Sequence, residues 1–400
     1  MTATLPPCAI PAQCQATPLA AWHQAHGGKL VDFAGWWMPL QYGKVMDEHH
    51  AVRQAAGLFD IGHMGLLCLD GDAATVLNAL DGLVPQAVSA LSPGKAIYTQ
   101  LLNTQGGILD DLIIYHLPET GLGGAARPTD FSPILLIVNA SNTASDIEWL
   151  QAHLPPSVTL RPMREQWTLW ALQGPKFQQV LATLGISSDH LPSRFGVSPQ
   201  TLTLNGQTLE TVLCRTGYTG EDGIEWIVPQ SVTVALWDAT LAAGKAIGLL
   251  PVGLAARDTL RLEAAYPLHG HDIDPTVSPL EAGLSWSVKL DKPGDFIGKT
   301  ALVAEKSTGV PRKTVCLKLL AKAIARQHDT IMVNDTVIGE VTSGSISPTL
   351  GDPIAMGLID TTKAVSPDGV ALKTGDTVTV MVRGKAIPAV IFPRPFYKGV

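Results

Sequence analysis

Cysteine is scarce in this chain and positive charge is in deficit, and each shortage excludes a class of protein. Five cysteines are spread over 400 residues without CxxC spacing: Cys8, Cys14, Cys68, Cys214 and Cys316. An odd, dispersed set argues against a disulfide framework and a structural zinc site, so we expect reduced and mostly buried thiols. With 28 Lys and Arg against 35 Asp and Glu, the net charge is −7. Such a chain has no excess of positive charge for a phosphate backbone, which argues against nucleic acid as a partner.

The chain also lacks an apolar run long enough to cross a membrane. A typical long run, residues 134–138, is strand-sized, whereas a membrane-spanning helix needs about 20 residues. The first 18 residues show neither the basic nor the apolar region of a targeting signal, and no arginine precedes Arg53. We therefore expect no membrane association and a cytoplasmic location.

Metal-ligand spacing is missing as well. The pair His49-His50 and the group His269, His271 and Asp272 are the candidates. Neither matches HExxH or another recognised ligand pattern, so we predict no metal site.

What the chain has is enough apolar sequence for a large core. Hydrophobic residues make up 46% of it, and its length suits two or three domains. Beyond residue 301 the pattern changes to short β-runs separated by turns, at residues 315–319, 330–333, 337–341, 354–359, 377–382 and 387–392. This predicts a small all-β barrel or sandwich, with the domain boundary within residues 304–312.

The most informative stretch is residues 98–117, YTQLLNTQGGILDDLIIYHL. Gly106-Gly107 between two β-patterned segments predicts a hairpin with a type I′ turn, in which both central residues have positive φ. The second strand is apolar on both faces and carries Asp110 and Asp111, and a buried carboxylate is costly unless it is paired or functional. Consecutive strand residues point to opposite faces, so only one of the two is expected to face a polar cavity. Alternatively, both lie at the edge of the turn.

Helical periodicity predicts helices at residues 45–56, 72–80, 231–246 and 252–264. Residues 143–146, TASD, form an N-terminal cap for another helix that extends through Leu150. Residues 118–133 form a Gly/Pro loop without periodicity, most simply a surface insertion. Residues 215–226, RTGYTGEDGIEW, place glycine-rich turns before a strand that contains Glu225. Glycine lets the backbone approach a ligand closely, although an acidic surface hairpin has the same pattern. Arg257 could bind a carboxylate ligand or pair with Asp258 or Glu263, and spacing leaves both open.

Taken together, several strings resemble the aminomethyltransferase, or T-protein, family of the glycine cleavage system. They recur in the family's order over residues 17–398: VDFAGWWMPLQY, EHHAVRQAAGLFDIGHMG, YTQLLNTQGGILDDL, RTGYTGEDGIEW, GLAARDTLRLEA, DIDPTVSPLEAGLSWSVKLDK, FIGKTAL and VTSGSISPTLG. The resemblance implies an α+β, multidomain, cloverleaf-like fold. Residues 17–303 would form a folate-binding region of two lobes, and residues 312–398 a C-terminal all-β barrel.

The resemblance also implies a reaction and its partners. An aminomethyl group on the lipoyl arm of the H-protein is released as ammonia plus a methylene unit, which tetrahydrofolate captures as 5,10-methylenetetrahydrofolate. Tetrahydrofolate is thus a co-substrate, and no metal or flavin is implied. A local basic patch of Lys289, Lys292 and Lys299 is our hypothesis for docking of an acidic H-protein.

Site residues follow from the same resemblance. Asp111 is similar to the catalytic carboxylate that orients a folate nitrogen. The expected wall of the folate pocket is Met64, Tyr98, Ile113 and Val138, and its polar and aromatic contacts are Asn139, Tyr218, Glu225, Arg257 and Tyr266. From the residues alone, His63 and Met64 could equally be core packing.

Two other functions fit this fold. One is a folate-dependent binding or repair-type protein. The other is a sarcosine or dimethylglycine demethylase module, which is joined to a flavin domain, and no GxGxxG follows an initial strand here. The set of Asp111, Tyr218 and Glu225 favours the transferase.

Overall fold

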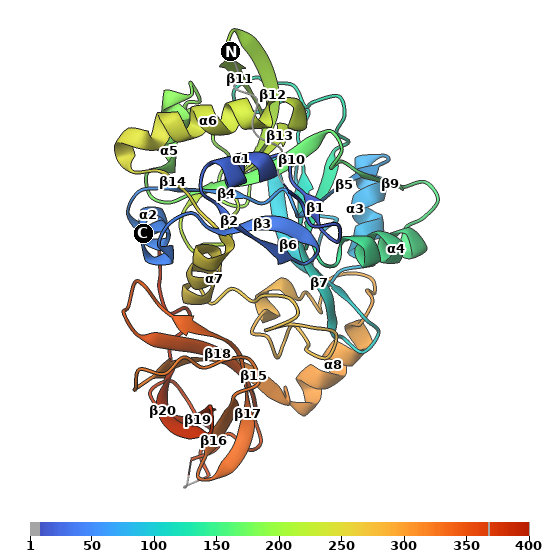
Figure 1. The fold of residues 1–400 in the computed structure, drawn as a ribbon. Coiled ribbons are helices and arrows are strands. Elements are labelled where there is room, and N and C mark those ends of the chain that lie inside the picture. The colour runs from blue at the N-terminus through green and yellow to red at the C-terminus, as the bar shows by residue number, and fades with distance from the viewer. Residues whose placement is uncertain (1–8, 367–368, 400) are drawn as a thin grey trace.

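The computed structural model describes residues 9–366 and 369–399, and in these residues the strands form three open sheets and a closed barrel. Helices and strands are mixed along the chain (Figure 1), so the predicted α+β class is confirmed. Cys8 lies outside the described residues; Cys68, Cys214 and Cys316 are buried free thiols and Cys14 is half-buried.

A three-stranded sheet lies near the N-terminus, in the order β1-β3-β2. Its elements are β1 (Gln15–Ala16), α1 (Ala20–Ala25), β2 (Lys29–Phe33) and β3 (Trp36–Gln41). It packs on the rest of the protein through Trp36 and Met38, which are 4% and 0% exposed.

The first large sheet has six strands in the order β11-β12-β13-β10-β4-β14. Its strands are β4 (Gly57–Asp60), β10 (Trp167–Gln173), β11 (Val197–Leu204), β12 (Gln207–Cys214), β13 (Gly223–Pro229) and β14 (Leu250–Pro251). The helices that follow or precede them are α2 (Val45–Gln54), α5 (Phe177–Thr183), α6 (Thr233–Gly244) and α7 (Leu254–Glu263). Every residue of β10 is buried, because its two faces belong to different core clusters.

The second large sheet has five strands in the order β6-β7-β8-β5-β9. Its strands are β5 (Gly65–Asp70), β6 (Lys95–Leu102), β7 (Ile108–His116), β8 (Ile134–Val138) and β9 (Thr159–Pro162). Its helices are α3 (Ala73–Asp81) and α4 (Thr143–His153). Tyr115 and Ile137 from this sheet share one buried cluster with Leu169 and Ile227 from the other. The two large sheets therefore share a core.

The hairpin of β6 and β7 is confirmed, but the predicted type I′ turn is wrong. The strands are joined by residues 103–107, and of the two glycines only Gly106 has positive φ, at +85°. Asn103 closes the loop because its Oδ1 accepts hydrogen bonds from the N–H groups of Gln105 and Gly107, both at 2.9 Å. Gly107 is needed for space, since a Cβ there would lie 1.9 Å from the carbonyl oxygen of Pro275.

The predicted helices are present with shifted ends. The 45–56 prediction ends at Gln54, and the 231–246 prediction divides into α6 between the 3₁₀ turns Gln230–Val232 and Lys245–Ile247. Further 3₁₀ turns lie at Ser188–His190 and Ser285–Ser287. The 118–133 loop lies against β11, where Leu122 N–H donates to Ser198 Oγ at 3.0 Å.

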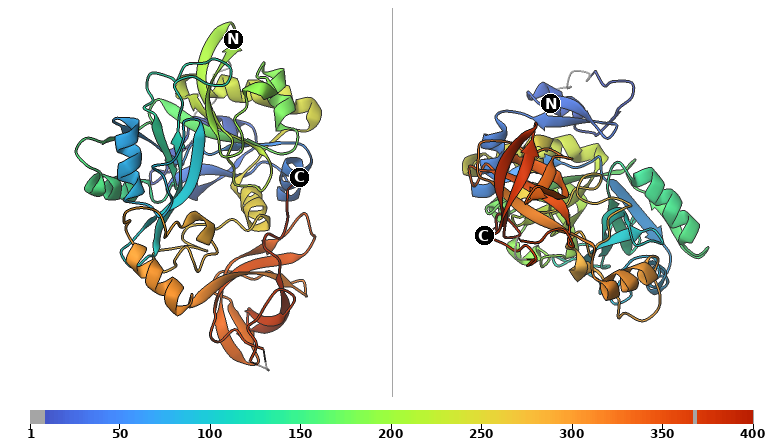
Figure 2. Two further views of the ribbon diagram at one scale, coloured as in Figure 1. Left: turned by 180° about the vertical axis from the view of Figure 1, so that it is seen from behind. Right: turned by 90° about the horizontal axis from the view of Figure 1, so that it is seen from below.

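The predicted C-terminal β-structure is a closed barrel in the order β15-β18-β17-β16-β19-β20. Its strands are β15 (Arg312–Leu319), β16 (Thr330–Val333), β17 (Thr336–Ile346), β18 (Pro353–Asp360), β19 (Thr377–Val382) and β20 (Lys385–Phe392), and α8 (Lys299–Thr308) precedes it. The front and back views in Figures 1 and 2 place the barrel at one end of the molecule.

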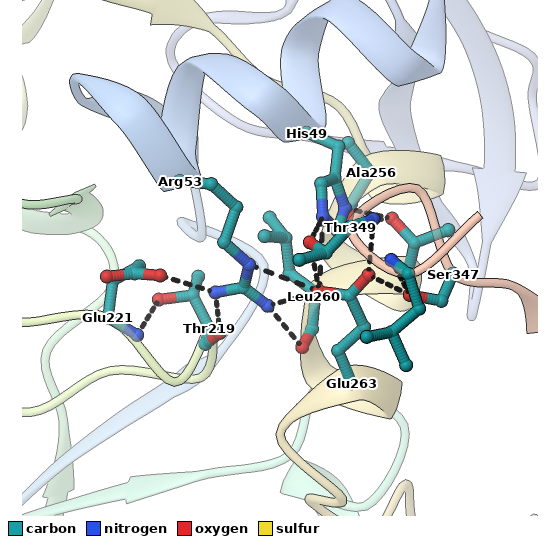
Figure 3. A network of polar contacts seen from close by, with 11 residues as sticks. His49, Arg53, Thr219, Glu221, Ala256, Leu260, Glu263, Ser347 and Thr349 are labelled. Carbon is teal, nitrogen blue, oxygen red and sulfur yellow. Dashed lines mark hydrogen bonds and ion pairs between the residues drawn. The ribbon is translucent and has the colours of Figure 1, made fainter. Parts of the chain in front are cut away.

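A buried polar network joins the barrel to the rest of the protein (Figure 3). Glu263 at the end of α7 accepts hydrogen bonds from Arg53 Nη2 on α2 at 2.8 Å and from Thr349 Oγ1 of the barrel at 2.8 Å. His49 Nε2 lies 3.2 Å from the same carboxylate. These contacts hold the pKa of Glu263 at about 2 against the opposing effect of burial. Because α7 also packs on β17 and β18, it fixes the barrel relative to the two sheets.

Candidate active site

A cavity of about 950 Å³ opens where the two large sheets, α7 and the C-terminal segment meet. Such a volume suits a ligand of drug or cofactor size. Nine of the ten residues expected at a ligand site line it: Met64, Tyr98, Asp111, Ile113, Asn139, Tyr218, Glu225, Arg257 and Tyr266. These residues lie far apart in the sequence, between Met64 and Tyr266, and tertiary folding brings them together.

Val138 is the exception, and its expected place in the pocket wall is corrected. Its side chain is 0% exposed and packs in the cluster behind the five-stranded sheet, together with Leu67 and Leu150. Side chains alternate along β8, so the neighbouring Ile137 reaches the cavity instead.

Asp111 lies in the cavity wall on the central part of β7. Its Oδ1 accepts a hydrogen bond from Asn139 Nδ2 at 2.8 Å, and its Oδ2 accepts one from Tyr98 Oη at 2.9 Å. Burial, and then the nearby charge of Asp110, raise the pKa of Asp111 to about 6. Near neutral pH the group is thus a carboxylate with a basicity much higher than that of an ordinary aspartate.

Asp110 points to the opposite face, as the strand alternation predicts. It does not cap the hairpin turn, which Asn103 closes, and it forms no salt bridge with a basic residue in the part of the chain that the structure describes. Its carboxylate is 0% exposed and accepts hydrogen bonds from Asn139 N–H at 3.0 Å, Asn139 Nδ2 at 2.8 Å and Asn142 Nδ2 at 2.6 Å. The Asn139 amide therefore bridges the two neighbouring carboxylates.

Two aromatic pairs line the cavity. Tyr98 stacks on Trp286 with ring centroids 5.5 Å apart, and Tyr218 stacks on Tyr266 at 5.9 Å. Tyr218 Oη donates to the carbonyl of Pro267 at 2.5 Å, which fixes the ring. These faces, with Met64 and Ile113, suit a flat heterocycle.

Glu225 lies on β13, lines the cavity and is 7% exposed. Its Oε2 accepts hydrogen bonds from Thr216 Oγ1 at 2.5 Å and Tyr115 Oη at 3.3 Å. The alternative of an acidic surface hairpin is therefore wrong for this residue. With its Oε2 held by neutral hydroxyl donors, the carboxylate has remaining acceptor capacity for N–H groups of a ligand.

Arg257 makes neither of the pairs that spacing left open. Asp258 pairs with Arg261 at 2.7 Å, and Glu263 pairs with Arg53 at 2.8 Å. The Arg257 guanidinium lies 4.8 Å from the centre of the Tyr218 ring, and no salt bridge to it occurs within residues 9–366 and 369–399. It is thus a cation on the cavity wall that is open to an anionic or carbonyl group of a ligand.

The other lining residues include His63, Trp286 and Arg394, which were not expected at the site from the sequence. His63 is buried with Nδ1 unpaired among the described residues, and burial lowers its pKa to about 3, so it is neutral. Arg394 donates to the carbonyls of Ala282 and Ala265. The strings around His63 and Trp286 were recognisable, whereas nothing in the sequence near Arg394 indicates that the C-terminal segment returns to the cavity.

The hypothesis that Lys289, Lys292 and Lys299 form a basic patch for H-protein docking needs one correction. Lys292 is 7% exposed, and its ammonium group donates to the carbonyls of Val84 and Gln86 at 2.8 and 2.9 Å. It stabilises the loop after α3 and cannot be the centre of an exposed basic patch.

No cluster of three or more His, Cys, Asp or Glu residues suited to a metal ion occurs in the part of the chain that the structure describes. In the same residues no helix combines the length and apolar character needed to cross a membrane.

Comparisons with known proteins agree with this arrangement. A family model described as the GCVT N-terminal domain matches residues 19–292, and one described as the glycine cleavage T-protein C-terminal barrel domain matches residues 312–398. An aminomethyltransferase of Prochlorococcus marinus (strain MIT 9303) is 42% identical over 96% of this chain and 98% of the relative. One from Thermosynechococcus vestitus is 44% identical, with 96% of each covered.

A solved structure gives the same result. The glycine cleavage system aminomethyltransferase T from Bartonella henselae is 33% identical, with 96% of this chain and 98% of that chain covered and a TM-score of 0.82. The cavity with Asp111 at its wall thus lies in a fold shared along its length with enzymes of one activity. This chain therefore belongs to the aminomethyltransferase family, the T-proteins of the glycine cleavage system, and is a transferase.

Proposed function

We propose that the cavity binds tetrahydrofolate and that Asp111 is the catalytic carboxylate for transfer of a methylene unit to it. The observation that carries this proposal is the setting of Asp111: a buried carboxylate on the cavity wall, held by Tyr98 and Asn139, with a pKa of about 6. A group with this pKa accepts a hydrogen bond strongly at neutral pH.

The other lining residues support a folate-shaped ligand. In this proposal Glu225 accepts N–H groups from the amino edge of the pterin, because a carboxylate accepts two parallel N–H bonds. The pterin lies against Met64 and Ile113 and beside the aromatic pairs. Arg257 and Asn139 are proposed as polar contacts.

The reaction begins with an aminomethyl group bound to a sulfur of the reduced lipoyl arm of an H-protein. Its carbon loses the bonds to nitrogen and sulfur and gains bonds to two nitrogens of tetrahydrofolate. One of the two folate N–H protons ends on the lipoyl thiol and the other on the departing amino group, which leaves as ammonia, so the step is balanced without an oxidant. Asp111 accepts a hydrogen bond from the reacting N–H and orients that nitrogen for attack.

The lipoyl arm has to enter through the mouth of the cavity. Trp286 and Phe195 line the cavity and are 54% and 45% exposed, which supports them as apolar contacts for the hydrocarbon part of the arm. We further propose, from the sequence alone, a cytoplasmic location, folding units at residues 17–303 and 312–398, and no metal or flavin of the protein's own.

A coupled assay tests the proposal. Purified protein, aminomethylated H-protein and tetrahydrofolate should give ammonia and 5,10-methylenetetrahydrofolate in equal amounts, with little turnover when tetrahydrofolate is omitted. Binding of tetrahydrofolate without ammonia release would instead identify a folate-binding protein. A flavin absorption spectrum in the purified protein would favour the demethylase module.

A further inference from the structure

A third carboxyl group lies behind the two neighbouring aspartates. Asp146 is in the first turn of α4 and is 3% exposed. Its position is fixed by the backbone, because its N–H donates to the carbonyl of Asn142 at 2.8 Å. Asn142 in turn donates from Nδ2 to Asp110 Oδ1 at 2.6 Å. The carboxyl groups of Asp110 and Asp146 thus lie close together around Asn142, and a hydrogen bond between them contributes to raising the pKa of Asp146.

The Asp146 side chain has none of the partners that a buried anion needs. Its Oδ2 is buried without a hydrogen-bond partner, and neither a salt bridge nor a donor to its carboxyl group occurs within the described residues 9–366 and 369–399. An ionised carboxylate in such a place would cost several kcal/mol, so the group is expected to keep its proton. A protonated carboxyl is a donor and needs an acceptor.

Asp110 is the acceptor within reach. It is the acceptor in all three of its hydrogen bonds, from Asn139 and Asn142, and a carboxylate has acceptor capacity for a fourth. Desolvation and the charge of Asp110 both raise the pKa of Asp146, to about 10. The donors are thus distributed so that one member of the pair is an anion and the other an acid.

We propose that Asp110 and Asp146 share one proton, so that the pair carries a single negative charge and holds the Asn139 amide in position to donate to Asp111. Asp146 is then a positioning residue that acts through Asp110 and Asn139. It also limits the negative charge near Asp111 to one unit. Proton sharing between Asp110 and Asp146 does not depend on the proposed function, whereas its effect on turnover rests on the proposed role of Asp111.

The charge near Asp111 should therefore appear in the pH dependence of the reaction. The titratable groups that face this cluster are Asp110 and Asp111 on β7, Asp146 on α4, Tyr98 on β6 and His269 on the loop after α7. Asn142 Nδ2 lies 3.0 Å from His269 Nδ1. Activity that needs the Asp111 carboxylate should fall as the pH drops through its pKa, which gives the acid limb of kcat/KM.

Infrared spectroscopy at pH 8 tests the proton directly, without reference to activity. Ordinary carboxyl groups are ionised at this pH, so the wild-type protein should show a carboxylic-acid C=O band that shifts on labelling with ¹³C-aspartate. The band should disappear in Asp146→Asn. Asp111→Asn is the matched control from the same cluster and should keep it. A wild-type protein without the band, or an Asp146→Asn variant that retains it, overturns the proposal.

The acid limb of kcat/KM gives the second test. Asp146→Asn replaces a neutral acid by a neutral amide that still donates to Asp110, so the limb should stay within about 0.3 pH unit of the wild type. Asp110→Asn removes the single charge and should move the limb down by about one pH unit or more. If Asp146→Asn itself moved the limb down by that much, Asp146 would be an anion and the proposal would fail. If the wild-type protein had no activity in the coupled assay, the proposed function would be refuted, but the infrared test of the shared proton would still hold.

Discussion

Asp111→Asn should make the protein more stable and nearly inactive at the same time. The change keeps the size of the side chain and removes its charge. The amide oxygen of Asn can still accept from Asn139 Nδ2, which lies 2.8 Å from the carboxylate, and its NH2 group can donate to Tyr98 Oη, which lies 2.9 Å from it. What it removes is a buried negative charge next to that of Asp110.

The size of the stability gain follows from the pKa. The pKa of Asp111 is raised from 3.8 to about 6, a difference of about 2 units, and each unit corresponds to about 1.4 kcal/mol. The folded state therefore binds the proton more tightly than the unfolded state does, and above pH 6 the ionised group destabilises the fold by at most about 3 kcal/mol. This penalty decreases as the pH falls from 6 to 4 and is absent below it. Asp111→Asn should recover much of it at pH 8 and little at pH 4.

Turnover should fall in Asp111→Asn, although the stability of the variant rises. A positioned carboxylate at a reacting nitrogen typically contributes about 10²- to 10⁴-fold in rate, so single-turnover transfer should slow by that order while tetrahydrofolate binding changes less. Urea unfolding of both proteins at pH 8 and pH 4, beside the coupled assay, measures the two effects. A variant that is slow but less stable at pH 8 would refute the electrostatic reasoning. One with normal turnover would remove Asp111 from catalysis.

Three further changes test other parts of the structure. Glu225→Gln should weaken tetrahydrofolate binding by about 1 to 3 kcal/mol in calorimetry, and unchanged affinity would place the ligand away from Glu225. Glu263→Gln should cost up to about 3 to 5 kcal/mol in urea unfolding at pH 7, because the buried Arg53 loses one of its two carboxylate partners and keeps only Glu221. With a folded pKa of about 2, the stability from Glu263 is complete above about pH 4.5 and is lost as the pH falls toward 2, so an equal cost at pH 2 would contradict this account. Gly107→Ala should lower stability by about 1 to 3 kcal/mol, since its Cβ would meet the Pro275 carbonyl at 1.9 Å, whereas Gly43→Ala has open space and should not.

Much of the fold was predictable because it depends on local patterns. Short β-patterned runs separated by turns located the six barrel strands and the hairpin of β6 and β7. Period-two alternation along β7 separated Asp110 from Asp111, since side chains of adjacent strand residues point to opposite faces. The strings that resemble the T-protein family indicated the activity and ten site residues, of which nine line the cavity.

The sequence could not determine which groups pair across long distances. Arg257 has acidic residues one and six places away, yet both pair with other arginines, because the packing of α2 and α7 brings Arg53 to Glu263. Lys292 looks like a surface charge and is buried, because three backbone carbonyls converge on its ammonium group.

The surroundings of Asp110 and Asp111 show most clearly which features local sequence patterns determine and which depend on tertiary packing. Alternation along β7 determined that one carboxyl faces the cavity and the other the interior. Only the tertiary structure placed Asn139, Asn142 and Asp146 around Asp110, because β8 and α4 reach it from about 30 residues further along the chain. The pKa of Asp111 depends on desolvation and on the charge of this neighbour, and both are properties of the packed interior that no local pattern contains.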